Sequence, residues 1–150
     1  MNNNFYPPWW DTTLTIFNKY EDSQTHVVTW YKHTIDNCFW KYTGNKLTID
    51  QVTLDTNRIV CRIPKSAKFK EKFEWVQVPN DKMSKFFTLG VGDIIVKGKV
   101  DDEINEYQAN KRSSDLLGKY KALQGCMEVE AVAINVGNGR CSEHYYVQGI

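Results

Sequence analysis

The sequence lacks the charge imbalance and the long apolar runs that mark several common protein classes. Its 150 residues hold 19 Lys and Arg against 18 Asp and Glu, a formal net charge of +1. A dedicated duplex-DNA binder is usually more basic, and a disordered chain has less than the 41% hydrophobic content found here. No stretch approaches the ~18 apolar residues of a membrane span, and residues 1–4 lack the basic and apolar segments of a signal peptide. We therefore expect a protein made in the cytosol, with no membrane partner.

Close cysteine pairs are also missing. The four cysteines are scattered along the chain, at Cys38, Cys61, Cys126 and Cys141. We interpret them as reduced thiols of the core, because free cysteine is among the most buried residue types. Cys141 and His144 have the spacing of metal ligands, but zinc needs three or four ligands and no second close pair is present. The sequence therefore predicts no metal and no cofactor.

Motifs of catalysis are absent as well. The sequence contains no Walker loop, nucleophile elbow or dinucleotide fingerprint, since Gly90-Val91-Gly92 leads into an apolar strand-like run where a phosphate-binding loop would open a helix. The acidic cluster 101–103 is typical of a solvated turn, and no motif ties a cysteine to a histidine. We predict no catalytic residue and expect the protein not to be an enzyme.

Aromatic and β-branched residues, in contrast, are plentiful. Aromatic residues make up 13% of the chain, with five Trp and eight Tyr, a composition that favours β structure and interfaces. The chain is organised around residues 86–100. There Gly90-Val91-Gly92-Asp93 predicts a tight turn, Ile94-Ile95-Val96 predicts a strand, and Gly98 predicts a bulge or a close backbone approach.

Alternating apolar residues predict further strands on both sides of this stretch. The expected strands are 14–20, 26–34, 38–42, 46–54, 58–63, 94–100, 126–136 and 144–150. Turn residues separate them at 21–24, 36–37, 44–45, 55–57 and 137–139. The apolar phase slips within 46–54, which a bulge would explain. Met127, Val129, Ala131 and Ala133 are expected on one face, and Pro64 is expected to end its strand because it lacks an N–H.

Two short helices are expected between the strands, one turn within 79–85 and a helix near 116–122 capped by Ser113-Ser114-Asp115. No repeat or low-complexity linker divides the chain. The sequence thus predicts a mainly β protein, with residues 13–150 forming a single antiparallel β-barrel or sandwich. It would have about seven or eight strands, one or two short helices and a long loop over 64–81.

Residues 1–12 are predicted to form an extended arm. Pro7-Pro8 favours a polyproline-like path directly before Trp9 and Trp10. Large rings are costly to leave in water, so these indoles either fold back over the chain's own core or dock on a partner. For the second alternative the candidate docking residues are Pro7, Pro8, Trp9 and Trp10.

The loop 64–81 is the least regular long segment, and loops of this length are usually functional or mobile. Its lysines are Lys65, Lys68, Lys70 and Lys72. Phe69 and Phe73 lie among them, so the loop is suited to contact a nucleic-acid backbone and to stack on bases. The alternative is a solvated loop whose aromatic rings pack underneath.

Three short patterns carry a resemblance to a known family. They are Leu89-x-x-Gly92-Asp93-Ile94-Ile95-Val96-x-Gly98, His144-aromatic-x-Val147-x-Gly149, and an opening of Leu14-Thr15-Ile16-Phe17-Asn18-x-Tyr20 followed by Val28-Thr29-Trp30-Tyr31. Together they resemble small proteins encoded among the minor capsid and head-tail connector genes of tailed phages and prophages of Gram-positive bacteria. The Pro-Pro-Trp-Trp arm is not part of this pattern.

The resemblance implies a neck component of the virion, a head-completion or stopper protein assembled in the bacterial cytoplasm, with no catalytic residues. It implies a homo-oligomeric ring of six-fold or twelve-fold symmetry. The partners would be a portal or adaptor ring above, a tail terminator or tail tube below, and packaged double-stranded DNA, met without sequence preference by the four lysines of the loop. Two alternatives stay open: a tail-side role such as a tail terminator, and a single-stranded nucleic-acid-binding barrel that uses residues 65–72.

Overall fold

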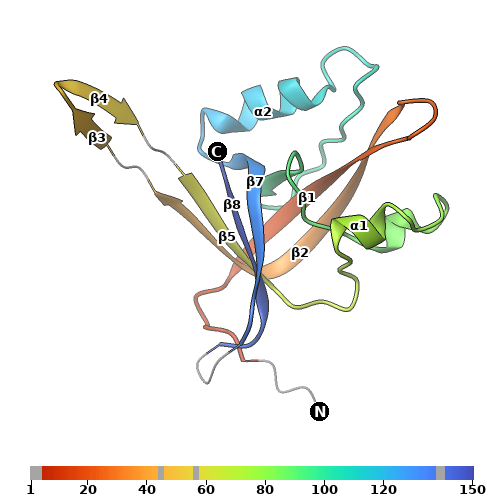
Figure 1. Ribbon diagram of the computed structural model, residues 1–150, viewed down its shortest axis with the longest axis horizontal. Coiled ribbons are helices and arrows are strands. Elements are labelled where there is room, and N and C mark those ends of the chain that lie inside the picture. The colour runs from red at the N-terminus through yellow and green to blue at the C-terminus, as the bar shows by residue number, and fades with distance from the viewer. Residues whose placement is uncertain (1–4, 44–45, 56–57, 138–140) are drawn as a thin grey trace.

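A computed structural model describes residues 5–43, 46–55, 58–137 and 141–150. Figure 1 shows the elements in order along the chain. The strands are β1 (Thr12–Glu21), β2 (Val28–Thr43), β3 (Lys46–Ile49), β4 (Val52–Asp55), β5 (Arg58–Pro64), β6 (Ile94–Lys97), β7 (Cys126–Asn135) and β8 (His144–Gly149). The helical elements are α1 (Lys72–Trp75), the 3-10 turn η1 (Met83–Lys85) and α2 (Ser113–Lys121). Among the described residues, no helix is long and apolar enough to cross a membrane.

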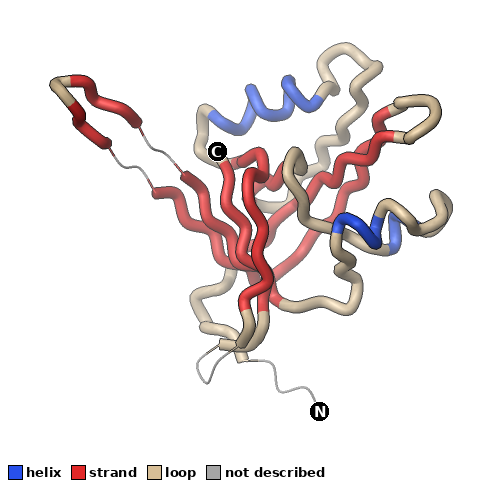
Figure 2. Tube along the Cα trace, in the orientation of Figure 1, coloured by secondary structure: helices blue, strands red, loops and turns tan. Residues whose placement is uncertain are grey.

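Six strands close into a barrel in the order β1-β2-β5-β8-β7-β6, and every neighbouring pair is antiparallel. The remaining strands, β3 and β4, pair only with each other and form a hairpin that extends away from the barrel (Figures 1 and 2). The predicted mainly β fold, an antiparallel barrel with short helices, is therefore confirmed.

The expected division of residues 26–42 into two strands is wrong. β2 is one strand of 16 residues, and the Asp36-Asn37 pair that predicted a turn lies inside it. Asn37 has a φ of 60° and the β1–β2 register shifts nearby, so the strand bends without losing its ladder. This bend lets β2 pair first with β1 and then with β5.

The single strand expected over 46–54 is also wrong, because the chain reverses in its middle. Asp50 and Gln51 have φ values of 49° and 67°, and two successive positive φ angles are typical of the tight turn of a two-residue hairpin. The shift in the alternation of apolar residues is therefore caused by this turn and not by a bulge. The turns predicted at 44–45, 55–57 and 137–139 lie wholly or partly outside the described residues.

β7 carries a bulge that alters its predicted buried face. Met127 and Val129 are buried as expected, but the register shifts between Val129 and Ala131. Ala131 and Ala133 are consequently exposed, and Val132 packs against the core in their place. The expectation that all four alternating residues share one buried face fails at the bulge.

The barrel interior and the space under α2 hold separate apolar clusters. The first includes Leu14, Ile16, Cys38, Cys61, Ile63, Ile95, Met127 and Val147, and the second includes Phe17, Ile94, Val96, Ile104, Leu116 and Cys126. All four cysteines are free of disulfides, and only Cys141 is not fully buried. The prediction of core thiols is therefore confirmed for Cys38, Cys61 and Cys126 and is wrong for Cys141, which is only partly buried.

The turn predicted at residues 90–93 is confirmed. The N–H of Asp93 donates to the carbonyl of Gly90 at 3.1 Å, and Gly92 has a φ of 93°. The close approach predicted at Gly98 is also present, since its N–H donates to the carbonyl of Thr13 at 2.6 Å. These contacts fix β6 against β1, where the short strand closes the barrel.

The helical predictions hold with shifted limits. η1 lies within the turn expected over 79–85, and α2 begins at Ser113, slightly before the expected start. The carboxylate of Asp115 accepts the N–H of Arg112 at 3.1 Å and caps the helix. The loop 64–81 also contains α1, held by the fully buried Trp75, whose ring lies edge-on to Tyr20 and Tyr31.

Candidate functional site

The arm folds back over one end of the barrel. Phe5 and Ser142 exchange hydrogen bonds: the N–H of Phe5 donates to the Ser142 Oγ, and the N–H of Ser142 donates to the Phe5 carbonyl at 2.7 Å. The hydroxyl of Tyr6 donates to the carbonyl of Glu143 at 2.6 Å and accepts the N–H of Lys65 at 3.0 Å. The described part of the arm, from residue 5, is therefore tied to the two residues before β8 and to the residue that follows β5.

The two adjacent indoles of the arm have different environments. Trp10 is only 6% exposed and packs against the rings of Tyr6, Phe39 and His144, with centroids 5.2, 6.4 and 5.0 Å away. Trp9 is 65% exposed. Trp10 thus covers its own barrel, whereas Trp9 is available to another molecule.

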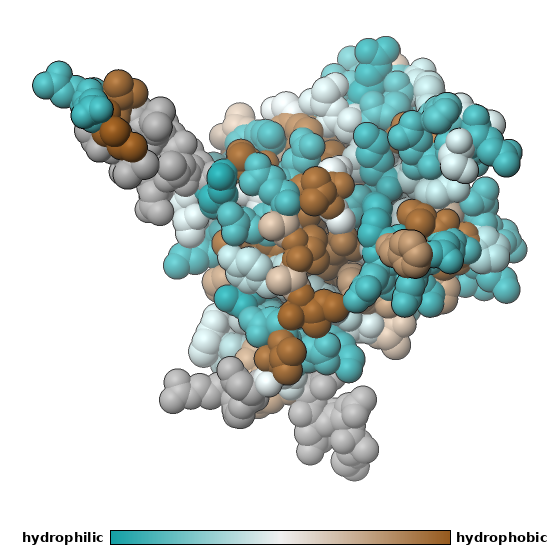
Figure 3. Space-filling view, viewed as in Figure 1, coloured by the Kyte–Doolittle hydropathy of each residue, from teal (hydrophilic) through white to brown (hydrophobic). Residues whose placement is uncertain are grey.

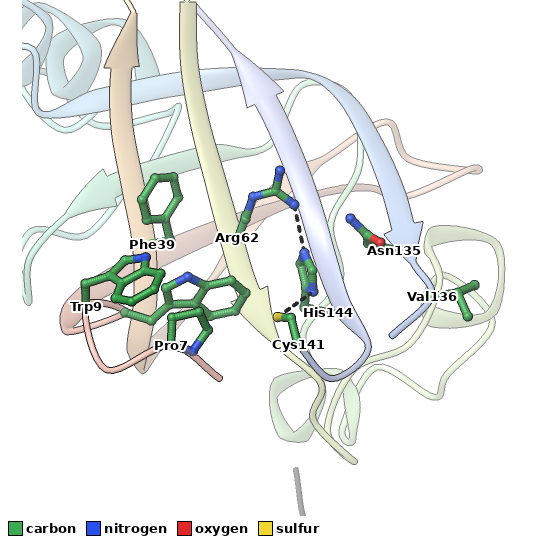
Figure 4. A pocket seen from close by; sticks show the side chains of 9 residues that line it. Pro7, Trp9, Phe39, Arg62, Asn135, Val136, Cys141 and His144 are labelled. Carbon is green, nitrogen blue, oxygen red and sulfur yellow. Dashed lines mark hydrogen bonds between the residues drawn. The ribbon is translucent and has the colours of Figure 1, made fainter. Parts of the chain in front are cut away.

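A pocket of about 360 Å³ opens beside these indoles (Figure 4). Its lining combines three arm residues with the outer faces of β2, β5, β7 and β8 and the loop before β8. The lining residues are Pro7, Trp9, Trp10, Phe39, Arg62, Asn135, Val136, Cys141 and His144. The structure therefore brings Pro7, Trp9 and Trp10 together in one site, while Pro8 is exposed outside its lining.

The hydrogen-bond partners of His144 in this pocket identify which nitrogen of its neutral ring carries the proton. The Arg62 Nη1 lies 2.8 Å from the His144 Nε2, and a guanidinium can only donate, so Nε2 is the acceptor. In the neutral ring the proton then sits on Nδ1, which donates to the Ser142 carbonyl at 3.0 Å. The ring is fixed by both nitrogens.

This arrangement does not activate Cys141. Its Sγ lies 3.6 Å from the His144 Nδ1, but that nitrogen already carries a proton and cannot accept one from the thiol. Burial also raises the pKa of Cys141. Among the described residues no group of three or more His, Cys, Asp and Glu side chains is placed to hold a metal ion. The aromatic walls and the Arg62 guanidinium suit the pocket to binding a protein side chain.

The four lysines of the loop 64–81 do not form one patch. Lys72 is part of the fold, because its Nζ donates to the Asp93 Oδ1 at 3.0 Å and to the Lys19 carbonyl at 2.9 Å. Lys65 pairs with Glu143 at 3.3 Å, and the Lys70 Nζ lies 4.7 Å from the centre of the Phe86 ring. Lys68 is exposed.

The two phenylalanines of this loop differ in the same way as the indoles. Phe69 stacks on Tyr145 with a centroid distance of 4.0 Å and meets Phe87 at 5.6 Å, so it packs under the loop. Phe73 is 77% exposed. The loop therefore presents one free ring, and a platform that stacks successive bases on both rings is not formed.

The projecting β3–β4 hairpin is not predicted from the sequence. The β3–β4 hairpin projects from the barrel, and its tip carries Ile49 and Val52, which are 53% and 57% exposed (Figure 3). A single two-stranded hairpin is marginally stable in water. The one sequence feature that points to this hairpin is the shift in the alternation of apolar residues around Asp50-Gln51. It is easily missed, because this turn lacks the Asn-Gly or Asp-Gly pair that identifies most tight hairpins.

Comparison with protein families gives one result. Residues 9–150 match the model of a family described as a family of unknown function, DUF6751. The chain belongs to this family. No curated protein and no solved structure matches it. In this DUF6751 protein the match spans the barrel, the hairpin, Trp9 and Trp10, and it begins after Pro7-Pro8.

Proposed function

We propose that this DUF6751 protein is a structural subunit of the head-tail junction of a tailed phage. It acts as a stopper-type connector, a ring beneath the portal or adaptor that links the head to the tail. The short patterns shared with phage neck proteins support the proposal. The observation that carries it is the β3–β4 hairpin, which leaves the barrel and exposes two β-branched side chains at its tip.

A hairpin of this kind favours assembly over catalysis. Its apolar tip leaves water only when another molecule covers it, and a hairpin without further strands is marginal. When a projection on one copy docks at a different place on the next, the contact is heterologous and closes into a ring if the rotation allows. The weak contact of each copy is then multiplied around the ring.

The proposal gives the loop 64–81 a secondary role in the DNA channel. Lys65, Lys68 and Lys70 can meet packaged double-stranded DNA without sequence preference, whereas Lys72 is held by Asp93. With a net charge of +1, a single copy would bind DNA weakly. Contact with DNA therefore depends on the ring, which brings many copies to the same duplex.

The first experiment is electron microscopy of the purified protein mixed with the portal and adaptor proteins of the same phage. We expect density for this chain in a ring between head and tail. If the ring instead caps the tail tube, the protein is a tail terminator. A chain that stays monomeric in the presence of both partners contradicts the proposal.

A pair of variants connects the assembly to the hairpin. Ile49→Asp combined with Val52→Asp places charge at the exposed tip, and we expect assembly at least about tenfold weaker with an unchanged melting temperature. Val27→Asp is the matched control, because Val27 is 46% exposed in the turn between β1 and β2. If native mass spectrometry shows that the two variants assemble equally well, the hairpin tip does not contribute to ring formation.

A further inference from the structure

The outer edge of β7 is unpaired along half of its length. β6 pairs with β7 only from Cys126 to Glu128, whereas β8 pairs on the other side as far as Asn135. Within the described part of the chain, no strand lies against the second edge of β7 beyond the bulge at residue 130. The second half of β7 therefore has an open edge, although strands close the barrel around it; the ends of β1 and β2 beyond their ladders with β6 and β5 are other such edges among the described residues.

Two hydrogen bonds show which backbone groups face this edge. Glu128 and Ile150 donate to each other's carbonyls at 2.9 and 3.2 Å, so both residues turn their backbone groups toward each other. Backbone direction alternates along a strand, and the register past the bulge makes Ala131, Ala133 and Asn135 the next residues bonded to β8. The residues between them must direct their backbone N–H and C=O groups away from β8, toward the open edge.

Val132 and Ile134 are these residues. No described group bonds to their outward N–H and C=O groups. The edge carries none of the usual protection, since residues 131–135 contain neither a charge nor a proline. Ile134 and Val136 are 43% and 80% exposed, and Figure 3 shows hydrophobic side chains gathered over this part of β7. The edge is therefore ready to accept an added strand.

We propose that the β3–β4 hairpin of a neighbouring copy pairs with this edge and extends the sheet. This inference rests on the proposed ring and names its contact surface. Each hairpin strand has four residues and an outer edge with no partner strand among the described residues, which fits the short stretch from Ala131 to Asn135. Main-chain hydrogen bonds then supply affinity, as in other strand-addition complexes.

The hairpin of the same chain cannot fill this position. It leaves the barrel between Thr43 and Arg58, whose strands pair at the end of the barrel near Gly149. The open edge runs from Ala131, opposite Gln148, to the other end of the barrel, where Asn135 lies opposite His144, and in Figure 1 the hairpin points away from that end. Donor and acceptor therefore belong to different copies, and the contact runs head to tail, as a closed ring requires.

The added strand would also border the arm pocket. Asn135 ends the open edge and Val136 follows it, and both residues line that pocket. A strand paired with β7 would place alternate side chains beside Asn135 on the outer face, next to the exposed Trp9. One neighbour would thus cover the open edge, the pocket mouth and the free indole.

Photo-crosslinking tests the contact directly. p-Benzoylphenylalanine in place of Ile134 is introduced into isotope-labelled protein, which is mixed with unlabelled protein and illuminated after assembly. We expect mixed-isotope peptides that join position 134 to residues 46–55 of the other copy. Crosslinks from an assembled ring to any other segment overturn this inference and leave the ring proposal standing, whereas absence of a ring overturns both.

A proline substitution provides an independent measurement. Ile134→Pro removes the outward N–H, which a free edge tolerates because no ladder bond is lost. We expect ring formation at least tenfold weaker with little change in melting temperature. Ile134→Thr keeps the N–H and a β-branched side chain, and it should assemble normally. Equal assembly of the two variants overturns the strand-addition contact.

Discussion

At the scale of single residues, Asp93 joins the turn before β6 to the end of β1 and to α1. Its carboxylate accepts the N–H of Lys19 at 2.9 Å and that of Gly90 at 3.0 Å. It also accepts the Lys72 ammonium and the Asn18 amide, each at 3.0 Å. Burial raises the pKa of Asp93, and the Lys72 charge and the hydrogen bonds from Lys19, Lys72 and Asn18 oppose that rise. Asp93 therefore holds β1, the turn before β6 and α1 together.

Asp93→Ala should be among the most damaging single substitutions. It leaves the Lys72 ammonium and buried N–H groups without an acceptor, so we expect the free energy of unfolding to fall by about 3 kcal/mol. Urea denaturation followed by tryptophan fluorescence measures this loss. Asp93→Asn keeps the shape and one acceptor oxygen and should cost less. A loss below about 1 kcal/mol for the alanine variant would refute the role assigned to the carboxylate.

Only the local part of this arrangement could be predicted from the sequence. The Gly-x-Gly-Asp spacing indicates a turn in which Asp bonds to nearby backbone, and the bond from Gly90 is such a contact. The partners Asn18, Lys19 and Lys72 are 21 or more residues away. Nothing in a turn motif specifies distant donors, so the bond from Lys72 to Asp93 could not be foreseen when the four lysines of the loop were grouped together.

At the scale of elements, the contact between β7 and β8 depends on a missing side chain. A Cβ on Gly149 would collide with the carbonyl of Glu128, at the point where the bulge of β7 begins. Gly118, in α2, has nothing within 4 Å of its potential Cβ. The two glycines therefore affect stability in opposite ways: Gly149 lets β7 approach β8 closely, whereas Gly118 weakens α2.

Alanine at each position should therefore change stability in opposite directions. Gly118→Ala should raise the free energy of unfolding by roughly 0.5–1 kcal/mol, the usual gain inside an exposed helix. Gly149→Ala should lower it by about 2 kcal/mol, because backbone must shift to admit the methyl group. Thermal melting of the two variants beside the natural protein provides the comparison. Equal melting temperatures would contradict this assignment.

Element type was easier to predict than element limits. Alternating apolar residues identified the strands around Ile16, Cys61 and Val147, all of which are fully buried. The sequence predicts a turn at Asp36-Asn37, where the strand only bends, and a bulge near Asp50-Gln51, where the chain reverses. The two were confused because a bend inside a strand and a tight turn use similar polar residues. Which of them the chain forms depends on the strand that lies opposite, and pairing at a distance leaves no local signal.

At the scale of the whole molecule, three buried thiols couple stability to alkaline pH. Burial raises the pKa of Cys38 to about 12 and that of Cys126 to about 11, and it raises the pKa of Cys61 above its ordinary value. An unfolded chain loses these protons near pH 9, whereas the folded chain keeps them. Between pH 9 and the raised pKa of each thiol, the folded state therefore holds more protons than the unfolded state, and the free energy of unfolding falls as the pH rises through this range.

The expected slope is measurable. Each thiol lowers the free energy of unfolding by up to about 1.4 kcal/mol per pH unit above pH 9, until its folded-state pKa is reached. Urea denaturation at neutral pH and at pH values above 9 gives the slope for the natural protein. Cys126→Ala should be less stable at neutral pH but have a shallower alkaline slope. Identical slopes would show that the Cys126 thiol titrates normally in the folded protein.

The position of β8 in the barrel has a consequence for synthesis on the ribosome. β8 lies between β5 and β7, so the outer edge of β5 has no partner until residues 144–149 emerge. Most of the intervening chain, including β6 and α2, is translated first. Such distant pairing slows folding and leaves strand edges exposed to aggregation. A nascent chain stalled before β8 should therefore depend on chaperones that cover the edge of β5.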